Sequence, residues 1–412
     1  MTEQPGGRTF VQTSRVEMAE LDRWQQVGEE EARVVYEMTL RNELSGGTPV
    51  VREFEAEWRR QTGLPYALTT INGTAALFSA FFGLGIGPGD EVICPSYTWI
   101  CTISPAPFLG AAPVFCESDP RTMLADPDDI ERRITPRTKA IVAVHLWGWV
   151  CDMDRIMAIG EHYGIPVIED CSHAHGAEYK GRPVGSIGDA GCWSLQGSKA
   201  VSAGEGGVLA TRHVDVFERA CLAGQVNRIV GIDLNTPHYQ EYQPYGTGMK
   251  FRAHPLGIGI AGVQLKKLPE LNRRRRAYFE AVEAGLADIP GLRPIPTAPG
   301  STRGAYYGFP VHYDREVLGD MAQFVQAVNA HGITAGPNPY PPLHLLPYFA
   351  RGFDLYTGGR GVLAEGWKGY QPGDLPVTER MVEELLFLPV LSDPGEGAAQ
   401  VILNVLREVA AR

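Results

Sequence analysis

Two stretches decide the fold of this chain, Ile168-Glu-Asp-Cys-Ser-His-Ala-His-Gly-Ala177 and Gly191-Cys-Trp-Ser-Leu-Gln-Gly-Ser-Lys-Ala-Val-Ser-Ala-Gly-Glu-Gly-Gly207. An apolar, β-type run from Ile165 to Ile168 ends on an acidic pair. A second short strand then leads into a glycine-rich turn that carries Lys199. We therefore expect Asp170 and Lys199 at the ends of neighbouring strands, which is where α/β sheets bind their ligands.

The pairing of a carboxylate with a lysine at such a position favours one chemistry. Lysine carries an aldehyde cofactor as a Schiff base, and the carboxylate pairs with the pyridinium nitrogen of that cofactor. Each residue alone has an ordinary explanation, because Asp170 at a strand end can cap the next helix and Lys199 can be a solvated loop residue. Together with the motifs below, the pair predicts a pyridoxal phosphate site.

Composition limits the class of protein. The chain has 412 residues, of which 44% are hydrophobic, and its net charge is −11. One large and one smaller domain fit this length. The only basic tract, Arg273 to Arg276, lies in a charged helical stretch and is predicted to be a solvated or interfacial helix face. The charge therefore argues against a nucleic-acid or anionic-membrane partner.

Cysteine usage and hydropathy point to the compartment. The seven cysteines are scattered and mostly apolar in context, which is typical of buried thiols in a reducing compartment. None has zinc-ligand spacing, so no metal is expected. The stretch Met1 to Arg15 lacks an apolar core, and no run of about 18 apolar residues occurs. These features predict a soluble cytoplasmic protein without a membrane partner.

The order of elements predicts an α/β fold. Apolar β-type runs alternate with helical stretches, which indicates a mainly parallel sheet covered by helices on both faces. The expected strands are 66–70, 91–94, 112–116, 139–145, 165–170, 191–194 and 207–211. A smaller α/β unit follows, with a strand at 305–311 and helices at 321–330, 379–386 and 395–411. We divide the chain into an arm (1–45), a large cofactor-binding domain (46–288) and a small C-terminal domain (289–412).

Two further motifs favour the same site. Asn72-Gly-Thr-Ala-Ala-Leu77 opens a helix with small residues and a hydroxyl, and exposed backbone N–H groups at a helix start attract a phosphate. In Pro95-Ser-Tyr-Thr-Trp99, the indole of Trp99 follows a strand end, where a ring can stack on a pyridine face. Thr74 as a plain cap and Trp99 as a core residue are the alternatives.

The ordered set of motifs resembles the DegT/DnrJ/StrS family of sugar aminotransferases, which have the fold type I of the aspartate aminotransferase superfamily. The resemblance also covers Gly47-Thr-Pro-Val50, Ala203-Gly-Glu-Gly-Gly207 and Phe387-Leu-Pro389. It implies that Lys199 carries the cofactor and that Asp170 pairs with its pyridine nitrogen. It further implies that the phosphate is held by Gly73, Thr74, Ala75 and Ser194, and that Trp99 stacks on the ring.

The chain departs from its apparent relatives at two positions. His173 stands where many members have a glutamine facing the phenolic oxygen of the cofactor, and imidazole can accept or donate there. Lys250, in Gly248-Met-Lys-Phe-Arg252, stands where relatives have an asparagine that reaches the phosphate of the neighbouring subunit. The resemblance also places Tyr340 and His344 near the amino acceptor, although a plain proline-rich turn is an equal alternative.

The resemblance implies transfer of an amino group from glutamate or glutamine to a keto sugar, a keto-cyclitol or a related ring ketone of an antibiotic pathway. A sugar dehydratase of the same family is one alternative, but those relatives have histidine in place of Lys199. A ligand-binding regulator without catalysis is the other alternative. The irregular connection from Asn235 to Gly248 and an apolar face at Leu256, Ile258 and Ile260 predict a homodimer with shared active sites.

Overall fold

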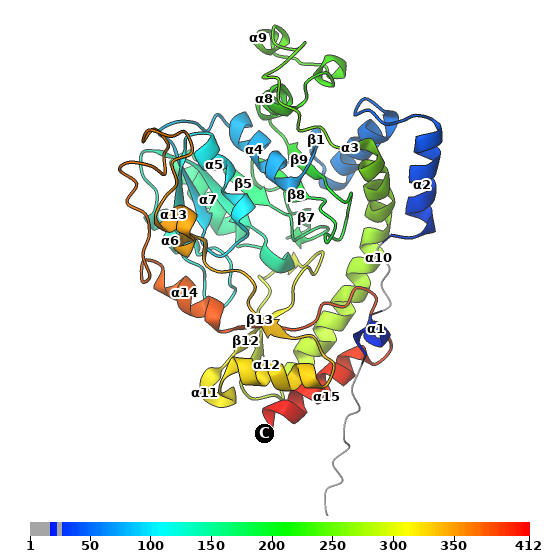
Figure 1. Ribbon diagram of the computed structural model, residues 1–412, viewed down its shortest axis with the longest axis vertical. Coiled ribbons are helices and arrows are strands. Elements are labelled where there is room, and N and C mark those ends of the chain that lie inside the picture. The colour runs from blue at the N-terminus through cyan, green and yellow to red at the C-terminus, as the bar shows by residue number, and fades with distance from the viewer. Residues whose placement is uncertain (1–16, 23–26) are drawn as a thin grey trace, which may run out of the picture.

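A computed structural model of the protein describes residues 17–22 and 27–412 (Figure 1). Its main sheet has seven strands in the order β1-β9-β8-β5-β4-β2-β3. They are β1 (Tyr66–Thr70), β2 (Glu91–Pro95), β3 (Ala112–Cys116), β4 (Thr138–Val144), β5 (Val167–Asp170), β8 (Ala190–Ser194) and β9 (Gly207–Thr211). Only β9 runs antiparallel to its neighbours. The expected α/β fold with a mainly parallel sheet is confirmed.

Helices cover this sheet and continue beyond it. They are α1 (Met18–Leu21), α2 (Glu29–Leu40), α3 (Pro49–Thr62), α4 (Gly73–Gly83), α5 (Pro105–Phe108), α6 (Pro127–Arg132), α7 (Met153–Tyr163), α8 (Val214–Gly224), α9 (Pro237–Gln240) and α10 (Pro255–Leu286). Helices α4 and α8 pack on each other and on β9, whereas α7 packs on β4 and β5. The apolar, branched residues of β4 and β5 are buried almost throughout, as expected for strands covered on both faces.

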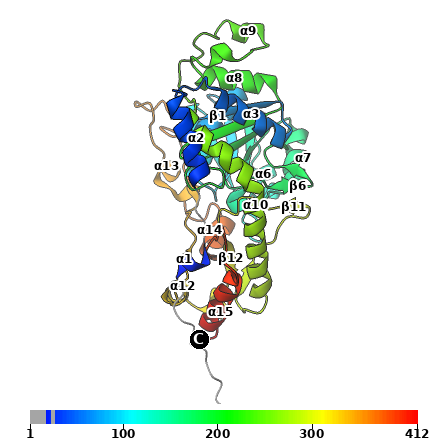
Figure 2. The same cartoon turned by 90° about the vertical axis from the view of Figure 1, so that its right-hand side faces the viewer.

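A second, four-stranded sheet lies at the other end of α10. It has the order β10-β12-β14-β13 and is antiparallel throughout, with β10 (Leu292–Pro294), β12 (Pro310–Tyr313), β13 (Gly336–Pro337) and β14 (Leu385–Phe387). The nearby helices are α11 (Arg315–Leu318), α12 (Met321–Ala330), α13 (Pro347–Ala350), α14 (Pro376–Glu383) and α15 (Ala398–Ala410). Figures 1 and 2 show α10 running from the main sheet to this smaller unit.

Three of the expected elements are wrong. The strand expected at 305–311 begins only at Pro310, because Ala305 and Tyr306 have φ values of 55° and 48°, which a strand does not allow. The helix expected at 379–386 ends at Glu383, and the following residues form β14 between two partner strands. The sequence predicts one helix over 256–268 and a separate helical stretch over 271–281, but both belong to the single helix α10, which continues through Pro269.

Part of the region 289–412 packs on the main sheet. Leu343 donates its N–H to the carbonyl of Ser96 at 2.8 Å, and Thr378 Oγ1 accepts the N–H of Ser118 at 2.9 Å. A third short sheet, with β6 (Glu178–Tyr179), β7 (Arg182–Pro183) and β11 (Ser301–Thr302), also joins the two regions. The division at 45/46 and 288/289 therefore stays a prediction.

The arginine run and the expected dimer face differ in part from the predictions. Arg275 is buried and Arg276 bonds to a tyrosine hydroxyl, so this run is only partly a solvated helix face. Ile258 is fully buried within the chain itself, and therefore it is not available to a partner.

Six of the seven cysteines are buried, as expected. Among the described residues, no helix combines the length and the apolar composition needed to cross a bilayer.

Candidate active site

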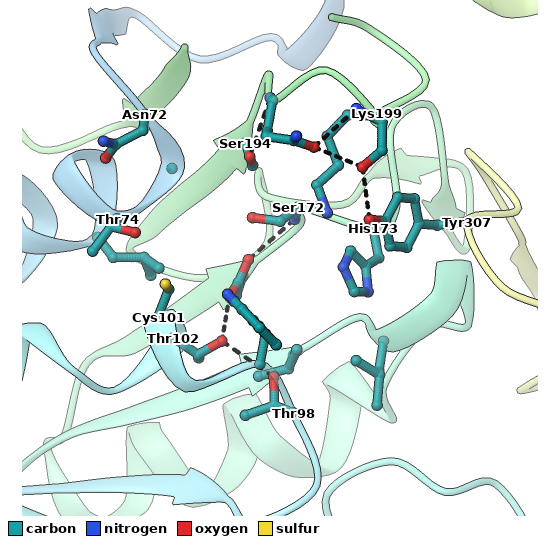
Figure 3. Close-up of a pocket in the computed structure, with 18 of the residues that line it drawn as sticks. Asn72, Thr74, Thr98, Cys101, Thr102, Ser172, His173, Ser194, Lys199 and Tyr307 are labelled. Carbon is teal, nitrogen blue, oxygen red and sulfur yellow. Dashed lines mark hydrogen bonds between the residues drawn. The ribbon is translucent and has the colours of Figure 1, made fainter. Parts of the chain in front are cut away.

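A cavity of about 570 Å³ lies at the carboxyl ends of the main-sheet strands. The segments after β1, β2 and β4 line it together with the ends of β5 and β8, so five strands direct residues into one space. Figure 3 shows Thr74, Ser194, Lys199 and His173 around this space. Asp170, the last residue of β5, belongs to the same lining. Asp170 and Lys199, which the sequence predicts to lie together at neighbouring strand ends, therefore line the same cavity.

The carboxylate of Asp170 is buried and held at both oxygens. Thr102 Oγ1 donates to Oδ2 at 2.7 Å, and the backbone N–H of Ser172 donates to Oδ1 at 3.1 Å. The hydroxyl of Thr98 lies 3.1 Å from that of Thr102 and extends this chain of hydrogen bonds (Figure 3). The carboxylate therefore has a fixed orientation without any contribution from a ligand.

The preceding residue, Glu169, points to the other face of β5 and holds the strand in place. Its carboxylate accepts the N–H groups of Gly185, Ile187 and Gly188 and forms a 2.9 Å hydrogen bond with His145 Nε2. Burial raises the pKa of Glu169, but His145 and the N–H groups outweigh it, so the pKa lies below its usual value.

The same contacts exclude a simple metal site at this position. Ligand atoms of His145, Glu169 and Cys171 lie within 4.8 Å of one another. Both oxygens of Glu169 already accept two hydrogen bonds each, which is the full capacity of that carboxylate. This cluster is therefore a satisfied structural network beneath β5.

Lys199 is carried by the turn between β8 and β9. Leu195 and Gly206 close the turn with a 2.8 Å backbone hydrogen bond, and the N–H of Lys199 donates to the carbonyl of Gln196 at 2.9 Å. The side chain is buried, with Nζ 3.7 Å from the centre of the Tyr307 ring. Burial lowers the pKa of Lys199, and Tyr307 and Asp170 oppose that shift. A lysine with a lowered pKa is suited to nucleophilic and proton-transfer chemistry.

His173 is buried beside this lysine. The backbone N–H of Trp147 donates to Nδ1 at 3.4 Å, and the imidazole stacks on Tyr307 with 4.1 Å between the ring centres. Burial, and then the charge of Lys199, hold the pKa of His173 well below its usual value. The ring is thus neutral and, because Nδ1 accepts, Nε2 carries the proton. His173 therefore presents a donor.

The start of α4 forms the opposite end of the cavity. Gly73, Thr74 and Ser194 line it, whereas Ala75 does not. The N–H of Ala75 donates to the side chain of Asn72, the N-cap, at 2.8 Å, so it is already used. A Cβ on Gly73 would lie 2.8 Å from Cβ of Ser194, so only glycine allows the helix start to approach β8 so closely. This end suits a phosphate.

Aromatic rings form the remaining wall. Trp99 is 52% exposed and its ring centre lies 5.3 Å from that of Tyr340, which in turn lies 4.6 Å from Trp147. Asn338 holds Tyr340, because its Nδ2 donates to the carbonyl of Tyr340 at 2.6 Å and its Oδ1 accepts from Tyr97 at 2.7 Å. Trp99 and Tyr340 are thus placed on the cavity as expected.

Two expected site residues lie elsewhere. His344 is fully buried and does not line the cavity; it is hydrogen-bonded to Ser96 Oγ at 2.7 Å and to Glu379 at 3.0 Å. Its ring therefore anchors the proline-rich turn, and a contact with the acceptor is not expected. Lys250 is exposed and forms an isolated β-bridge with Gln225, away from the cavity of its own chain.

Several residues that line the cavity were not predicted from the sequence. They include Thr98, Cys101, Thr102, Ser172, Gln196, Ser198, Glu205 and Tyr307. Thr102 lies only seven residues after the strand end at Pro95, so its proximity to the site was a usable signal. Tyr307 had no such signal, because it follows no strand of the main sheet.

The comparisons with known proteins define the class as aminotransferases. Residues 25–407 match the DegT/DnrJ/EryC1/StrS aminotransferase family. The chain is 34% identical over 343 residues to an L-glutamine:2-deoxy-scyllo-inosose aminotransferase from Streptoalloteichus tenebrarius, covering 81% of this chain and 80% of that protein.

Solved structures agree with this class. An aminotransferase from Psychrobacter cryohalolentis is 29% identical, with a TM-score of 0.83 and coverage of 95% of this chain and 99% of that one. The aminotransferase TlmJ from Streptoalloteichus hindustanus is 29% identical, with a TM-score of 0.77 and coverage of 93% and 97%. The chain belongs to the DegT/DnrJ/EryC1/StrS aminotransferase family.

Enzymes of this family depend on pyridoxal phosphate, and the residues present fit that cofactor. The cavity offers a buried lysine, a buried carboxylate with fixed orientation and a helix start whose glycine leaves room beside Ser194. These groups match an aldehyde, a pyridinium nitrogen and a phosphate, respectively.

Proposed function

We propose that this aminotransferase moves an amino group from glutamine or glutamate to a keto-cyclitol of the 2-deoxy-scyllo-inosose type. The observation that carries the proposal is the convergence of Lys199 and Asp170 in one cavity, closed on one side by Trp99 and Tyr340. The name of the relative that is 34% identical supports both the donor and the acceptor.

The charge of the cavity supports an uncharged acceptor. Among the described residues that line it, Lys199 is the one lysine or arginine, and it stands against the carboxylates of Asp170 and Glu205. A nucleotide-linked sugar carries phosphates that proteins usually bind with additional cations. A polyhydroxylated ring instead needs hydroxyl partners and an apolar face, which Ser198 and the aromatic wall provide.

The residues have separable roles in the reaction. Pyridoxal phosphate, when bound, supplies an electron sink for negative charge at the substrate carbon. Gly73, Thr74 and Ser194 would hold its phosphate, and Asp170 would keep its ring nitrogen protonated. Nζ of Lys199 takes the proton from the substrate carbon that bears the amine. The fixed orientation of Asp170 and the burial of Lys199 make both groups ready before a substrate enters.

A panel of ketones tests the proposed acceptor. The purified enzyme would be incubated with glutamine, glutamate or alanine and with 2-deoxy-scyllo-inosose, nucleotide-linked 3-keto and 4-keto sugars, or simple cyclic ketones, and the amine products measured. We expect the highest kcat/KM with glutamine and the cyclitol, and none with Lys199→Ala. A clear preference for a nucleotide-linked sugar would contradict the proposed acceptor, and inactivity on every ketone would contradict amino transfer itself.

We further propose a homodimer in which Lys250 serves the active site of the partner subunit. Lys250 is exposed on its own chain, and the protruding segment before it exposes the aromatic rings of Tyr242 and Tyr245. Exposed rings next to an exposed cation are typical of a surface that a second chain covers. Lys250 would then meet the cofactor phosphate as a point charge.

Subunit mixing tests this arrangement. Hybrids of Lys250→Ala and Lys199→Ala chains should contain one site with both lysines and should regain activity once exchange of subunits is shown. Lys266→Ala, which removes another exposed lysine, serves as the control and should retain cofactor as the unaltered enzyme does. A monomer at working concentration, or inactive hybrids, would contradict the shared site.

A further inference from the structure

Tyr307 lies directly over the amine of Lys199. Nζ is 3.7 Å from the centre of the ring, which is within cation–π distance (Figure 3). The phenol hydroxyl of Tyr307 is hydrogen-bonded to Ser198 Oγ at 2.8 Å. The hydroxyl of Ser198 in turn donates to the side chain of Gln196 at 2.6 Å. The imidazole of His173 also stacks on Tyr307, with 4.1 Å between the ring centres. The ring is therefore fixed at both its face and its hydroxyl.

The backbone that delivers Tyr307 is strained and heavily anchored. The two residues before it, Ala305 and Tyr306, adopt left-handed conformations with φ values of 55° and 48°. Non-glycine residues adopt such conformations at a cost, and strain of this kind is often found at functional sites.

Helix α10 holds this strained segment through three side chains. Asn272 accepts the N–H of Ala305 at 3.0 Å, Arg275 donates to the carbonyl of Ala305, and Arg276 donates to the hydroxyl of Tyr306 at 3.1 Å. Two of these three residues belong to the arginine run, for which composition alone gave no specific role. These three side chains of α10 therefore hold the segment that places Tyr307 in the cavity.

We propose that Tyr307 is a positioning residue whose ring face binds the ammonium of Lys199 whenever that amine carries no cofactor. The inference rests on the proposed function in one respect, namely that Lys199 is the amine that takes up and releases the cofactor. Each catalytic cycle then leaves the amine for a time without its covalent partner. The ring keeps Nζ inside the cavity during that time and stabilises its protonated form.

Several titratable groups besides Tyr307 interact electrostatically with Nζ of Lys199. The other titratable groups that act on or respond to it are Asp170, Cys101, His173 and His175. Burial lowers the pKa of Lys199, whereas the charge interaction and the hydrogen bond that its amine makes with Tyr307 raise it. A cation–π contact depends on the electron density of the ring face and not on the hydroxyl, which separates this role from a hydrogen-bonding role.

The pKa of Lys199 is the measurement that tests the proposal. The full-length enzyme would be converted to its pyridoxamine phosphate form with glutamine, so that the lysine carries no cofactor. Competitive acetylation with acetic anhydride between neutral and strongly alkaline pH, read from the Lys199 peptide by mass spectrometry, gives the pKa of this amine. The variants are Tyr307→Phe, Tyr307→Leu and mono-, di- and trifluorophenylalanine at position 307. Ser198→Ala is the control for the hydroxyl contact.

We expect Ser198→Ala to leave the pKa of Lys199 close to that of the unaltered enzyme, and Tyr307→Phe, which removes the hydroxyl but keeps the ring, to lower it less than Tyr307→Leu does. Tyr307→Leu should lower it by about half a unit to about one and a half units, the range of a partly desolvated cation–π contact. Each added fluorine should lower it further, because fluorine withdraws electron density from the ring face while the shape changes little.

The fluorine series decides the outcome, because Tyr307→Leu can also admit water or impair folding. A pKa that does not respond to fluorine would overturn the proposal, as would a Tyr307→Phe variant that loses as much as Tyr307→Leu. Borohydride reduction followed by mapping of the cofactor adduct tests, independently of this contact, whether Lys199 is the lysine that carries the cofactor. An adduct on another lysine would overturn the role of Lys199 in catalysis, whereas the fluorine series would still report on the contact itself.

Discussion

The two sides of the cavity are built in different ways. On the strand-end side, Asp170 and Ser194 terminate neighbouring parallel strands, and hydrogen bonds from the sheet region fix the carboxylate. On the aromatic side, Tyr307 and Tyr340 come from segments near the second sheet and are held by side chains such as Asn338. Trp99 on this side is half exposed, whereas Asp170 and Lys199 are buried.

We infer from this difference that residues on the strand-end side carry out the reaction, whereas residues on the aromatic side select the substrate. Groups that act on the reacting atoms need fixed positions, and a buried sheet edge provides them. Tyr340, which we propose contacts the acceptor, lies on a loop, and loops change more easily without disturbing the sheet. Substitutions on the strand-end side should therefore affect every substrate, whereas substitution of Tyr340 in the aromatic wall should affect the acceptor selectively.

Asp170→Asn should have the largest effect of the substitutions considered for this comparison. A neutral amide does not hold the ring nitrogen of the cofactor protonated, and loss of one partner of a buried ion pair costs about 3 to 5 kcal/mol. The rate of the half-reaction with glutamine should fall on the order of a hundredfold or more. Stopped-flow absorbance measures this rate.

Asp154→Asn, at an exposed carboxylate on α7, is the matched control and should leave the rate unchanged. Near-normal turnover of Asp170→Asn, with the fold intact by circular dichroism, would show that another group holds the nitrogen.

Thr102→Val should have a smaller effect on the same half-reaction. It keeps the shape of the side chain but removes the hydroxyl that donates to Asp170 at 2.7 Å. Hydrogen bonds to charged groups contribute about 1.5 to 3 kcal/mol, so the rate should fall about tenfold to about a hundredfold. Thr102→Ser, which retains the donor, should restore most of it. Equal losses in both variants would mean that packing, and not the hydrogen bond, accounts for the effect.

Tyr340→Leu should have the smallest effect, and only on one half-reaction. Loss of an aromatic contact of about 0.5 to 1.5 kcal/mol should raise the KM for the ketone about twofold to about tenfold. The half-reaction with glutamine should remain within error of the unaltered enzyme, and Tyr340→Phe should behave almost normally. A comparable loss in the glutamine half-reaction would remove the distinction between the two sides.

The strand-end side was largely predictable from the sequence. Strands β1, β3 and β9 have the bounds that periodicity and turn residues predicted, and helix α4 begins at the expected motif. Asp170 ends β5 and Lys199 follows β8, and because the ends of these neighbouring parallel strands meet at one edge, the convergence of the two residues follows from local patterns. The cap of α4 shows the limit of this reasoning, because Asn72 takes the N–H of Ala75 that the phosphate was expected to use.

The aromatic side was predictable only in part: Trp99 and Tyr340 were expected at the cavity, but the contacts that build this side join residues far apart in the chain. Tyr307 lay within a segment expected to be a strand, and the left-handed residues before it depend on hydrogen bonds from α10. Arg275 looked like a solvated residue, although it is buried against the carbonyl of Ala305. His344 looked like a ligand-binding residue, although it bonds to Ser96. No local pattern encodes such pairings.

The role of Lys199 is tested most directly by trapping the cofactor on the protein. The purified holoenzyme would be reduced with borohydride, digested and examined by peptide mass spectrometry, with Lys199→Ala treated in parallel. We expect a single pyridoxyl adduct on the peptide that contains Lys199 and none in the variant. An adduct on a different lysine, or an adduct that persists in Lys199→Ala, would contradict the assignment of Lys199 as the residue that carries the cofactor.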